Sequence, residues 1–235
     1  MLLHGFGSSH RAWDAVMPAL ARRRRAIAYD LPGHAGSLGH RPLGNAGVAA
    51  RAVLADLDRR GIGRAHLAGH SMGGAVAAVA ALTAPERCAS LTLLAPGGFG
   101  REVNHRLLAR FAAADDAGEL AVLVEQFFGW DSAVPEGLAL AMMAERAAPG
   151  GREALATIAA SLFDAGGQKT LPVDDLAATG VPIKVVWGTQ DRVIPTRQAH
   201  KLPGRIAVHI FEGVGHMLPY EIPDDVAALI LDNAR

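Results

Sequence analysis

Short aliphatic runs alternate with longer Ala-rich segments along most of the chain. The short runs are candidate strands because most of them end in Gly, Pro or Asp, which are typical of turns. These runs lie at residues 1–3, 26–29, 65–68, 91–95, 183–187 and 206–211. The longer segments space their apolar residues three and four apart, as an amphipathic helix does. This alternation predicts βαβ units and an α/β fold, with a mostly parallel sheet flanked by helices.

One long segment, from about residue 101 to residue 168, has no strand-like pattern. It contains four helical patterns separated by glycine and proline, at residues 107–114, 120–128, 138–147 and 153–162. We interpret this segment as a helical cap inserted after the fifth visible strand. The expected organisation is a core formed by residues 1–98 and 173–235, with a cap formed by residues 99–172.

Composition and charge narrow the classes of partner. Half of the 235 residues are hydrophobic, and the 23 lysine and arginine residues balance the 23 aspartate and glutamate residues. A net charge of zero argues against a nucleic-acid partner, because phosphate contacts need an excess of Lys and Arg. The single cysteine, Cys88, excludes an intramolecular disulfide and a cysteine zinc site. The longest weakly apolar stretch, residues 72–82, is shorter than the ~18–20 residues of a membrane helix. We therefore expect a cytoplasmic protein with no membrane partner.

A serine lies in the most glycine-rich turn of the chain, Gly69-His70-Ser71-Met72-Gly73-Gly74. The motif follows the candidate strand at 65–68 and precedes a helical pattern. In this strand–turn–helix context a G-x-S-x-G sequence exposes a nucleophilic serine, and the glycines leave room for the tight turn. The alternative interpretation is a turn whose serine only caps the helix. The flanking strand and helix favour the nucleophile.

A base and an acid for this serine follow the last two candidate strands. Asp191 comes after the strand at 183–187, and His216, flanked by glycine, comes after the strand at 206–211. In a catalytic triad His216 would be the base and Asp191 would orient its imidazole. Parallel strands end at one edge of the sheet, so we expect Ser71, Asp191 and His216 to meet there.

An acyl-transfer serine also needs hydrogen-bond donors for the oxyanion. We expect these donors to be two backbone N–H groups, those of Met72 and Phe6. Phe6 belongs to the segment His4-Gly5-Phe6-Gly7 after the first strand, where glycines let the backbone approach a substrate. We interpret His4 as a hydrogen-bonded structural residue.

Aromatic, histidine and methionine side chains in the cap or beside the triad are candidates for lining a substrate pocket. They are His70, Phe127, Phe128, Trp130, Met142, Met143 and Met217. The alternative is that these side chains pack the cap onto the core. The sequence has no phosphate loop, dinucleotide fingerprint or zinc motif. We therefore expect no cofactor and no metal, and a small-molecule substrate with a small to medium uncharged acyl group.

Five segments in succession resemble the α/β-hydrolase family over essentially the whole chain. They lie at residues 2–7, 30–34, 69–74, 187–191 and 213–216. The resemblance implies the α/β-hydrolase fold. It also implies a cofactor-free, carboxylesterase-like serine hydrolase that acts on an ester, a thioester or another activated carbonyl.

Residues 90–99 and 202–209 are similar to the hydrolase-like domain of the acyltransferase component of acetoin dehydrogenase complexes. This similarity implies an alternative function, as a hydrolase-like acyltransferase or scaffolding domain with a multienzyme complex as its partner. That component carries a lipoyl domain with an Asp-Lys-Ala acceptor. None of Lys169, Lys184 and Lys201 has this flanking sequence.

The resemblance also bears on the beginning of the chain. In the family, two strands precede the one that ends at His4, and they lie beyond the strand that matches residues 26–29. We expect the natural protein to extend upstream by roughly 20–30 residues, the length of two strands and their turns. Without them, we expect the strand at 26–29 to form an exposed edge that pairs with a second copy of the chain.

Overall fold

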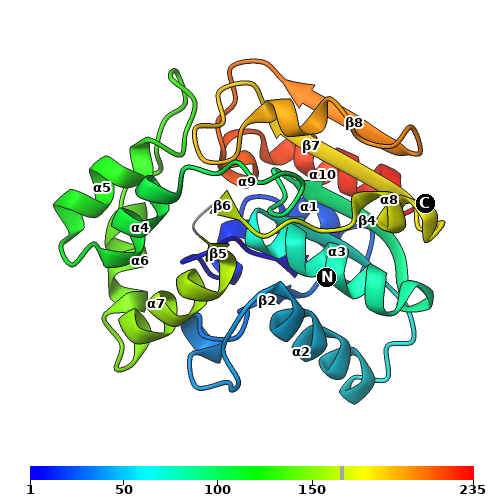
Figure 1. The fold of residues 1–235 in the computed structure, drawn as a ribbon, viewed down its shortest axis with the longest axis horizontal. Helices are drawn as coiled ribbons and strands as arrows, with labels where there is room; N and C mark the ends of the chain where they lie inside the picture. The colour runs from blue at the N-terminus through cyan, green and yellow to red at the C-terminus, as the bar shows by residue number, and fades with distance from the viewer. Residues whose placement is uncertain (165–166) are drawn as a thin grey trace.

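A parallel sheet forms the centre of the structure, a computed structural model that describes residues 1–164 and 167–235 (Figure 1). Its strands, in order across the sheet, are β2 (Ala28–Tyr29), β1 (Leu2–Leu3), β3 (Ala65–His70), β4 (Cys88–Leu94), β7 (Ile183–Gly188) and β8 (Ile206–Phe211). Every neighbouring pair is parallel, and Leu94 is in register with His70 on one side and Val186 on the other. All the strands predicted from the sequence are confirmed.

Helices cover both faces of this sheet (Figure 1). The helices on one face contact one another in sequence, and they are α2 (Ala46–Arg59), α3 (Met72–Thr83) and α8 (Val173–Ala178). The helices of the other face are α1 (Met17–Ala21) and α10 (Pro223–Asn233), with the short α9 (Leu218–Glu221) before α10. Single 3-10 turns lie at His10–Trp13, Ala35–Ser37, Pro85–Arg87 and Thr196–Ala199. This is the mostly parallel, helix-flanked sheet that the hydrophobic pattern predicts.

Four helices occupy the segment predicted as a cap. They are α4 (His105–Ala113), α5 (Ala117–Glu125), α6 (Leu138–Arg146) and α7 (Gly151–Leu162). Figure 1 shows them together on the left, the side toward which the arrowhead of β8 points. They follow β4, the fourth strand along the described chain and not the fifth, so our count of the preceding strands was wrong. The division into core and cap stays a prediction.

A short hairpin follows α7, where we expected no strand. Its strands, β5 (Phe163–Asp164) and β6 (Gly167–Gln168), form a separate antiparallel pair. The expectation failed because a two-residue strand is too short to produce an alternating pattern. The hairpin matters for function because residues on both of its strands line the cavity described below.

The order of the strands creates a crevice at one edge of the sheet. From β1 the chain runs to its neighbour β2 and then crosses β1 to form β3 on the other side. The connections after β1 and β3 therefore lead to opposite sides of β1, which is where open α/β sheets bind ligands. His4–Gly7 follows β1 and Ser71 follows β3, so the strand order places these two segments beside each other.

Close packing of α3 on the sheet holds this edge together. A Cβ atom at Gly73 would lie 2.2 Å from the carbonyl oxygen of Leu3, so the first turn of α3 rests directly on β1. Leu3, Leu67 and Leu91, on three adjacent strands, are at most 1% exposed. The beginning of α3, with Ser71 before it, is therefore fixed by the buried core.

The strand β2 lies at one edge of the described sheet, as expected from the sequence. The amino group of Met1 donates a hydrogen bond of 2.8 Å to the carbonyl oxygen of His66, and burial lowers its pKa to about 6. The upstream extension of the chain and its pairing with a second copy stay predictions.

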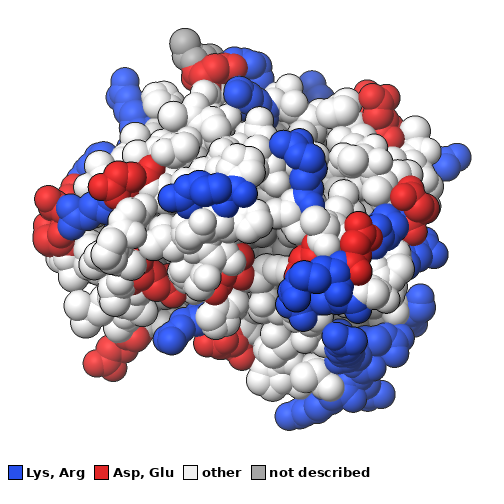
Figure 2. All heavy atoms as spheres, turned by 90° about the horizontal axis from the view of Figure 1, so that it is seen from below, with Lys and Arg blue, Asp and Glu red and all other residues white. Residues whose placement is uncertain are grey.

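Charged side chains of both signs occur over the face seen in Figure 2, with uncharged surface between them. This distribution agrees with the balance of acidic and basic residues in the sequence. Within residues 1–164 and 167–235, no helix combines the length and the apolar character needed to cross a bilayer.

Candidate active site

Ser71 occupies a strained turn between β3 and α3. Its φ is 53° and its ψ is −115°, a conformation that costs free energy for any residue with a Cβ. Backbone hydrogen bonds hold it: the Ser71 N–H donates to Leu94 O at 2.8 Å, and the N–H groups of Gly74 and Gly97 donate to Ser71 O at 3.0 Å. A Cβ at Gly69 would lie 2.2 Å from Gly73 O, so the turn admits only glycine there. These contacts are those of a turn that presents a serine.

Asp191 lies in the loop after β7 with its carboxylate surrounded by donors. Oδ1 accepts the backbone N–H groups of Val193 and Ile194, both at 2.8 Å. Oδ2 accepts the indole N–H of Trp187 at 3.2 Å and contacts His216 Nδ1 at 2.7 Å. The carboxylate is fully buried, and these bonds fix the orientation of both its oxygens.

The structure brings His216 and Asp191 together as predicted. Because Asp191 offers only acceptors when ionised, His216 Nδ1 is the donor, and in the neutral imidazole the free lone pair is then on Nε2. The backbone N–H of His216 donates to Phe127 O at 2.6 Å. The imidazole, with 3% of its side-chain surface exposed, is therefore held at its backbone and at Nδ1.

His70, which precedes Ser71 in the sequence, contacts this pair. The rings of His70 and His216 are 4.9 Å apart between centroids, and His70 Nε2 donates to His216 O at 2.8 Å. Within the described residues no hydrogen bond joins Ser71 Oγ to the imidazole of His216. Catalytic hydrogen bonds of this kind often tighten only in the complex with substrate.

The segment after β1 touches the serine. A Cβ at Gly5 would lie 3.3 Å from Ser71 Cβ. Two histidines hold the segment: His4 Nδ1 donates to Gly5 O at 2.7 Å, and His34 Nε2 accepts the Gly7 N–H at 3.1 Å. His4 is thus a structural residue, as we interpreted it from the sequence.

The two predicted oxyanion donors both lie at the cavity beside Ser71. Phe6 and Met72 line this cavity together with the serine. Neither of their backbone N–H groups donates a hydrogen bond to any part of the chain that the structure describes. Neither N–H group is therefore occupied within the described residues, and their role as oxyanion donors stays a prediction.

Three buried histidines near the serine have lowered pKa values. Burial lowers the pKa of His4 to about 3, that of His34 to about 4 and that of His70 to about 3. All three are at most 4% exposed. They therefore act near neutral pH as fixed hydrogen-bonding groups and not as acids.

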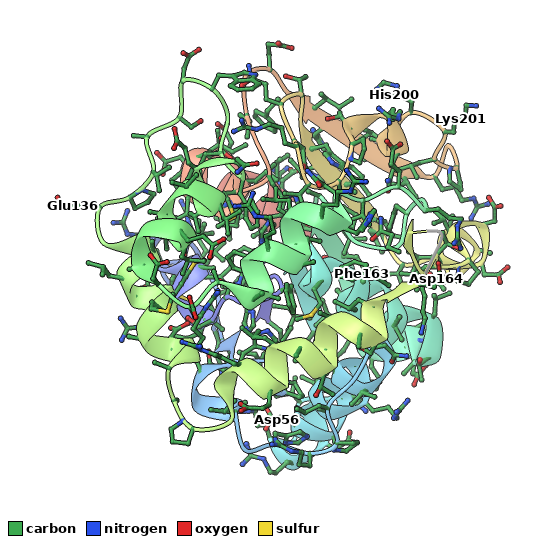
Figure 3. The ribbon with its side chains drawn as sticks, turned by 60° about the vertical axis from the view of Figure 1, so that its left-hand side comes forward. Asp56, Glu136, Phe163, Asp164, His200 and Lys201 are labelled. Atoms are coloured by element: carbon green, nitrogen blue, oxygen red, sulfur yellow. The ribbon has the colours of Figure 1, made fainter. Side chains whose placement is uncertain are left out.

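A cavity of about 250 Å³ opens at Ser71, and most of its wall is apolar. Its apolar side chains are Phe6, Ala46, Met72, Ala75, Val79, Val103, Leu108, Leu162, Phe163, Leu171 and Ile194. Figure 3 shows Phe163 near the middle of the molecule at the end of α7, while Glu136, His200 and Lys201 lie at the periphery. The polar wall residues are Asn45, Ser71, Ser161, Gln168 and Lys169.

None of the side chains predicted to line a substrate pocket lines this cavity. These are His70, Phe127, Phe128, Trp130, Met142, Met143 and Met217. Most pack internally: Phe127 lies 5.1 Å from the Phe111 ring and 6.2 Å from the His216 ring. Trp130 is instead 70% exposed, with the Arg192 guanidinium 4.2 Å above its ring. The alternative of structural packing therefore explains the buried members.

Apart from Phe6, Ser71 and Met72, the residues that line the cavity were not predicted from the sequence. Met72, Ala75 and Val79 recur at helical spacing after the serine, and that spacing was a usable signal for one wall. Asn45, at the start of α2, and Gln168, on β6, are brought in by tertiary packing, which no local pattern reveals.

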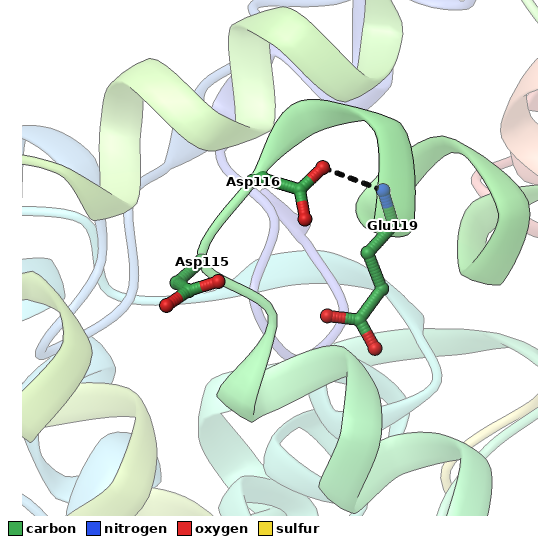
Figure 4. Close-up of side chains that lie close together, drawn as sticks. All are labelled: Asp115, Asp116 and Glu119. Atoms are coloured by element: carbon green, nitrogen blue, oxygen red, sulfur yellow. Dashed lines mark hydrogen bonds between the residues drawn. The ribbon is translucent and has the colours of Figure 1, made fainter.

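Three carboxylates at the start of α5 lie close enough together to hold a cation (Figure 4). They belong to Asp115, Asp116 and Glu119, with ligand atoms within 4.8 Å of one another. Helix capping explains their position, because Asp116 Oδ1 accepts the Glu119 N–H at 2.9 Å. Glu119 also forms an ion pair with Arg110.

Comparison with known proteins agrees with this architecture. A model of the Alpha/beta hydrolase family matches residues 1–229. A meta-cleavage product hydrolase from Pseudomonas fluorescens IP01 is similar in structure, with a TM-score of 0.86 at 23% identity, over 99% of this chain and 89% of that chain. The α/β-hydrolase fold expected from the sequence is confirmed.

Two curated relatives are both described as the dihydrolipoyllysine-residue acetyltransferase component of an acetoin cleaving system. The relative from Cupriavidus necator is 35% identical over 230 residues, which are 98% of this chain and 62% of the relative. The relative from Pseudomonas putida is 38% identical over 227 residues, which are 96% of this chain and 60% of the relative. The chain therefore spans about three fifths of their length.

The neutral histidines predict that the protein loses stability in acid. Because the pKa of a histidine in the unfolded chain is about 6.5, the unfolded state binds more protons than the folded state below that pH. The free energy of unfolding therefore falls as the pH is lowered, by about 2 kcal/mol per buried histidine between pH 7.5 and pH 5.

Urea denaturation of the wild type and of His70→Gln at pH 7.5 and pH 5.0 tests this expectation. The glutamine amide can reach the position of His70 Nε2, so it keeps a donor for His216 O, and it cannot be protonated in this range. We expect the loss of stability between the two pH values to be about 2 kcal/mol smaller in the variant. Equal losses in the two proteins would show that His70 is not held neutral by folding.

Proposed function

This chain belongs to the alpha/beta hydrolase family, and we propose that within it the protein is a serine hydrolase of esters, thioesters or other activated carbonyls. In this proposal Ser71 is the nucleophile, His216 the general base and Asp191 the residue that orients the base. The backbone N–H groups of Phe6 and Met72 hold the oxyanion.

The first half of the reaction forms an acyl-enzyme. Ser71 Oγ attacks the carbonyl carbon while His216 Nε2 takes the hydroxyl proton, and the carbonyl oxygen becomes an oxyanion. The Phe6 and Met72 N–H groups donate to this oxygen, and each such donor is worth about 10²–10³-fold in rate. When the tetrahedral intermediate collapses, His216 gives the proton to the leaving alcohol or thiol.

The second half repeats these steps with water. His216 removes a proton from water, whose oxygen attacks the acyl carbon, and the proton then returns to Ser71 Oγ as the carboxylic acid leaves. Asp191 stays ionised throughout and stabilises the imidazolium. The hydrogen bonds to Oδ1 from Val193 and Ile194 keep the carboxylate pointed at Nδ1.

The observation that carries this proposal is the buried 2.7 Å contact between His216 Nδ1 and Asp191 Oδ2 at the sheet edge where Ser71 follows β3. A buried carboxylate needs a partner, and a neutral histidine whose Nδ1–H is bound in this way has its lone pair on Nε2. The positive φ of Ser71 is typical of a nucleophilic serine in a strand–turn–helix motif.

A second function is favoured by the two relatives from acetoin cleaving systems. Here the chain would be a hydrolase-like acyltransferase or scaffolding domain of an acetoin dehydrogenase-type complex. The acyl-enzyme on Ser71 would then pass to a thiol acceptor in place of water, or would not form at all if the domain is a scaffold.

The cavity at Ser71 supports an uncharged acyl group as substrate. Met72, Ala75 and Val79 lie along α3, and seven residues of helix span about 10 Å. Lys169 is the only cationic side chain among the described wall residues. We propose that the acyl chain lies along α3, with its carbonyl at Ser71 and its end near Val79.

Replacing the nucleophile tests the proposed function. Ser71→Ala removes the atom that attacks, so kcat/KM for p-nitrophenyl butyrate should fall by at least about 10³-fold. Ser37→Ala, in the 3-10 turn after β2 and outside the cavity, should keep the wild-type value. Unchanged turnover in Ser71→Ala would overturn the assignment of Ser71 as nucleophile.

The products formed from an acetyl thioester distinguish the two functions in the same assay. Acetate formed at an equal rate with and without dihydrolipoamide indicates a hydrolase, whereas S-acetyl dihydrolipoamide formed at the expense of acetate indicates an acyltransferase. If the wild-type chain forms no product that depends on Ser71, both catalytic functions are contradicted. The role as a scaffolding domain would then be the remaining function.

The length of the acyl pocket is tested at Val79. Val79→Phe fills the end of the cavity, so kcat/KM for p-nitrophenyl octanoate should fall about 10- to 100-fold, since each methylene denied burial costs about 0.8 kcal/mol. The acetate ester should react as in the wild type. Val122→Phe, on the exposed surface of α5, is the matched control. An unchanged ratio of octanoate to acetate activity, or a preference for anionic acyl groups, would contradict this placement.

A further inference from the structure

One carboxylate outside the predicted triad gathers four hydrogen-bond donors. Glu221, the last residue of α9, accepts the N–H groups of Gly215 and Gly129 and the hydroxyl of Ser132 at Oε2. Its Oε1 accepts the N–H of Met217. The distances lie between 2.6 and 2.9 Å, and all four donors are neutral.

Two of these donors flank His216. The N–H groups of Gly215 and Met217 each donate to Glu221 at 2.9 Å, and the N–H between them, that of His216, donates to Phe127 O. Three consecutive backbone N–H groups are therefore bound. Glu221 spans the residue before and the residue after the proposed base, which restricts rotation of the backbone at His216.

The other two donors come from the segment between α5 and α6. Gly129 and Ser132 lie in this segment, and Gly129 also packs against the loop of His216. A Cβ at Gly215 would lie 2.4 Å from Gly129 N, so the two backbones are in direct contact. Glu221 is thus the shared acceptor that fastens this segment of the predicted cap to the loop of His216.

We infer that Glu221 is a positioning residue for the proposed base, and that it couples the segment of Gly129 and Ser132 to the direction of His216 Nε2. This inference rests on the proposed function. A change of about 1 Å in the position of a reacting group can cost 10²-fold in rate. The carboxylate therefore acts on turnover through His216, without touching the substrate.

An ionised carboxylate suits this position better than an amide. It offers two oxygens that only accept, and hydrogen bonds to a charged acceptor are stronger than those between neutral groups. In Glu221→Gln one of these oxygens becomes an NH₂ group that faces a backbone N–H. The variant thus keeps the size of the side chain and loses part of the hydrogen bonding to the loop.

The experiment compares kcat and KM for p-nitrophenyl butyrate in the full chain, with active sites counted from the initial burst. Glu221→Gln should lower kcat per active site by about 10- to 100-fold and change KM by less than about threefold. A loss of folded protein alone would lower the number of active sites and leave kcat per site unchanged. Glu136→Gln removes an exposed charge from the same predicted cap and should behave as the wild type.

Two more variants separate the sources of the effect. Ser132→Ala removes one donor from the segment between α5 and α6 and leaves both bonds to the loop of His216, so its loss in kcat should be the smaller one. Glu221→Asp keeps the charge but is one methylene too short to hold both oxygens in place. It should also lower kcat, and it provides the test if Glu221→Gln does not fold.

The inference fails if Glu221→Gln and Glu221→Asp both keep kcat per active site within about twofold of the wild type. It also fails if Ser132→Ala loses as much kcat as Glu221→Gln, because the effect would then come from the segment between α5 and α6 alone. A wild-type rate in Ser71→Ala would instead overturn the proposed function, so the two failures can be distinguished.

Discussion

The site depends on one strained turn, the backbone of Ser71 held at positive φ between β3 and α3. The turn exists because α3 begins directly against the first strand, where Gly73 meets the carbonyl oxygen of Leu3. The N–H of Ser71 is bound on the other side by Leu94 O, at the end of β4. Buried strands on both sides thus compensate the cost of the conformation. The turn places the serine at the N-terminus of α3, at the point where the strand order reverses.

Buried polar groups around this turn are paired almost entirely with neutral partners. His4 and His34 hold the segment of Phe6, His70 binds the carbonyl oxygen of His216, and Asp191 accepts backbone and indole N–H groups. This pairing stabilises the site, because a buried polar group without a hydrogen-bond partner costs free energy. The N–H groups of Phe6 and Met72 donate to no described residue, and the proposed reaction needs both of them.

Much of this arrangement could be predicted from the sequence, and the reasons differ by element. Strands such as β7 and β8 carry mostly apolar runs, and Asp191 and His216 lie in the loops that follow them, so local pattern and sheet topology were enough to bring the two side chains together. The cavity wall was not predictable in this way, because Gln168 and Asn45 reach it through tertiary packing. The aromatic residues near residue 127 do not line the cavity at Ser71, because an apolar side chain beside a site packs the core as readily as it lines a pocket. The hairpin of β5 and β6 was not predicted, because a strand of two residues is too short to show an alternation of apolar and polar side chains.

The central claim is that Ser71 is an activated nucleophile, and a fluorophosphonate probe tests it most directly. Such a probe phosphonylates a serine only when a neighbouring base accepts the hydroxyl proton. The account predicts one adduct per chain, located by peptide mass spectrometry on the peptide that contains Ser71, and no adduct after heat denaturation. A folded chain that takes up no probe, or that carries the adduct on another serine, would contradict the account.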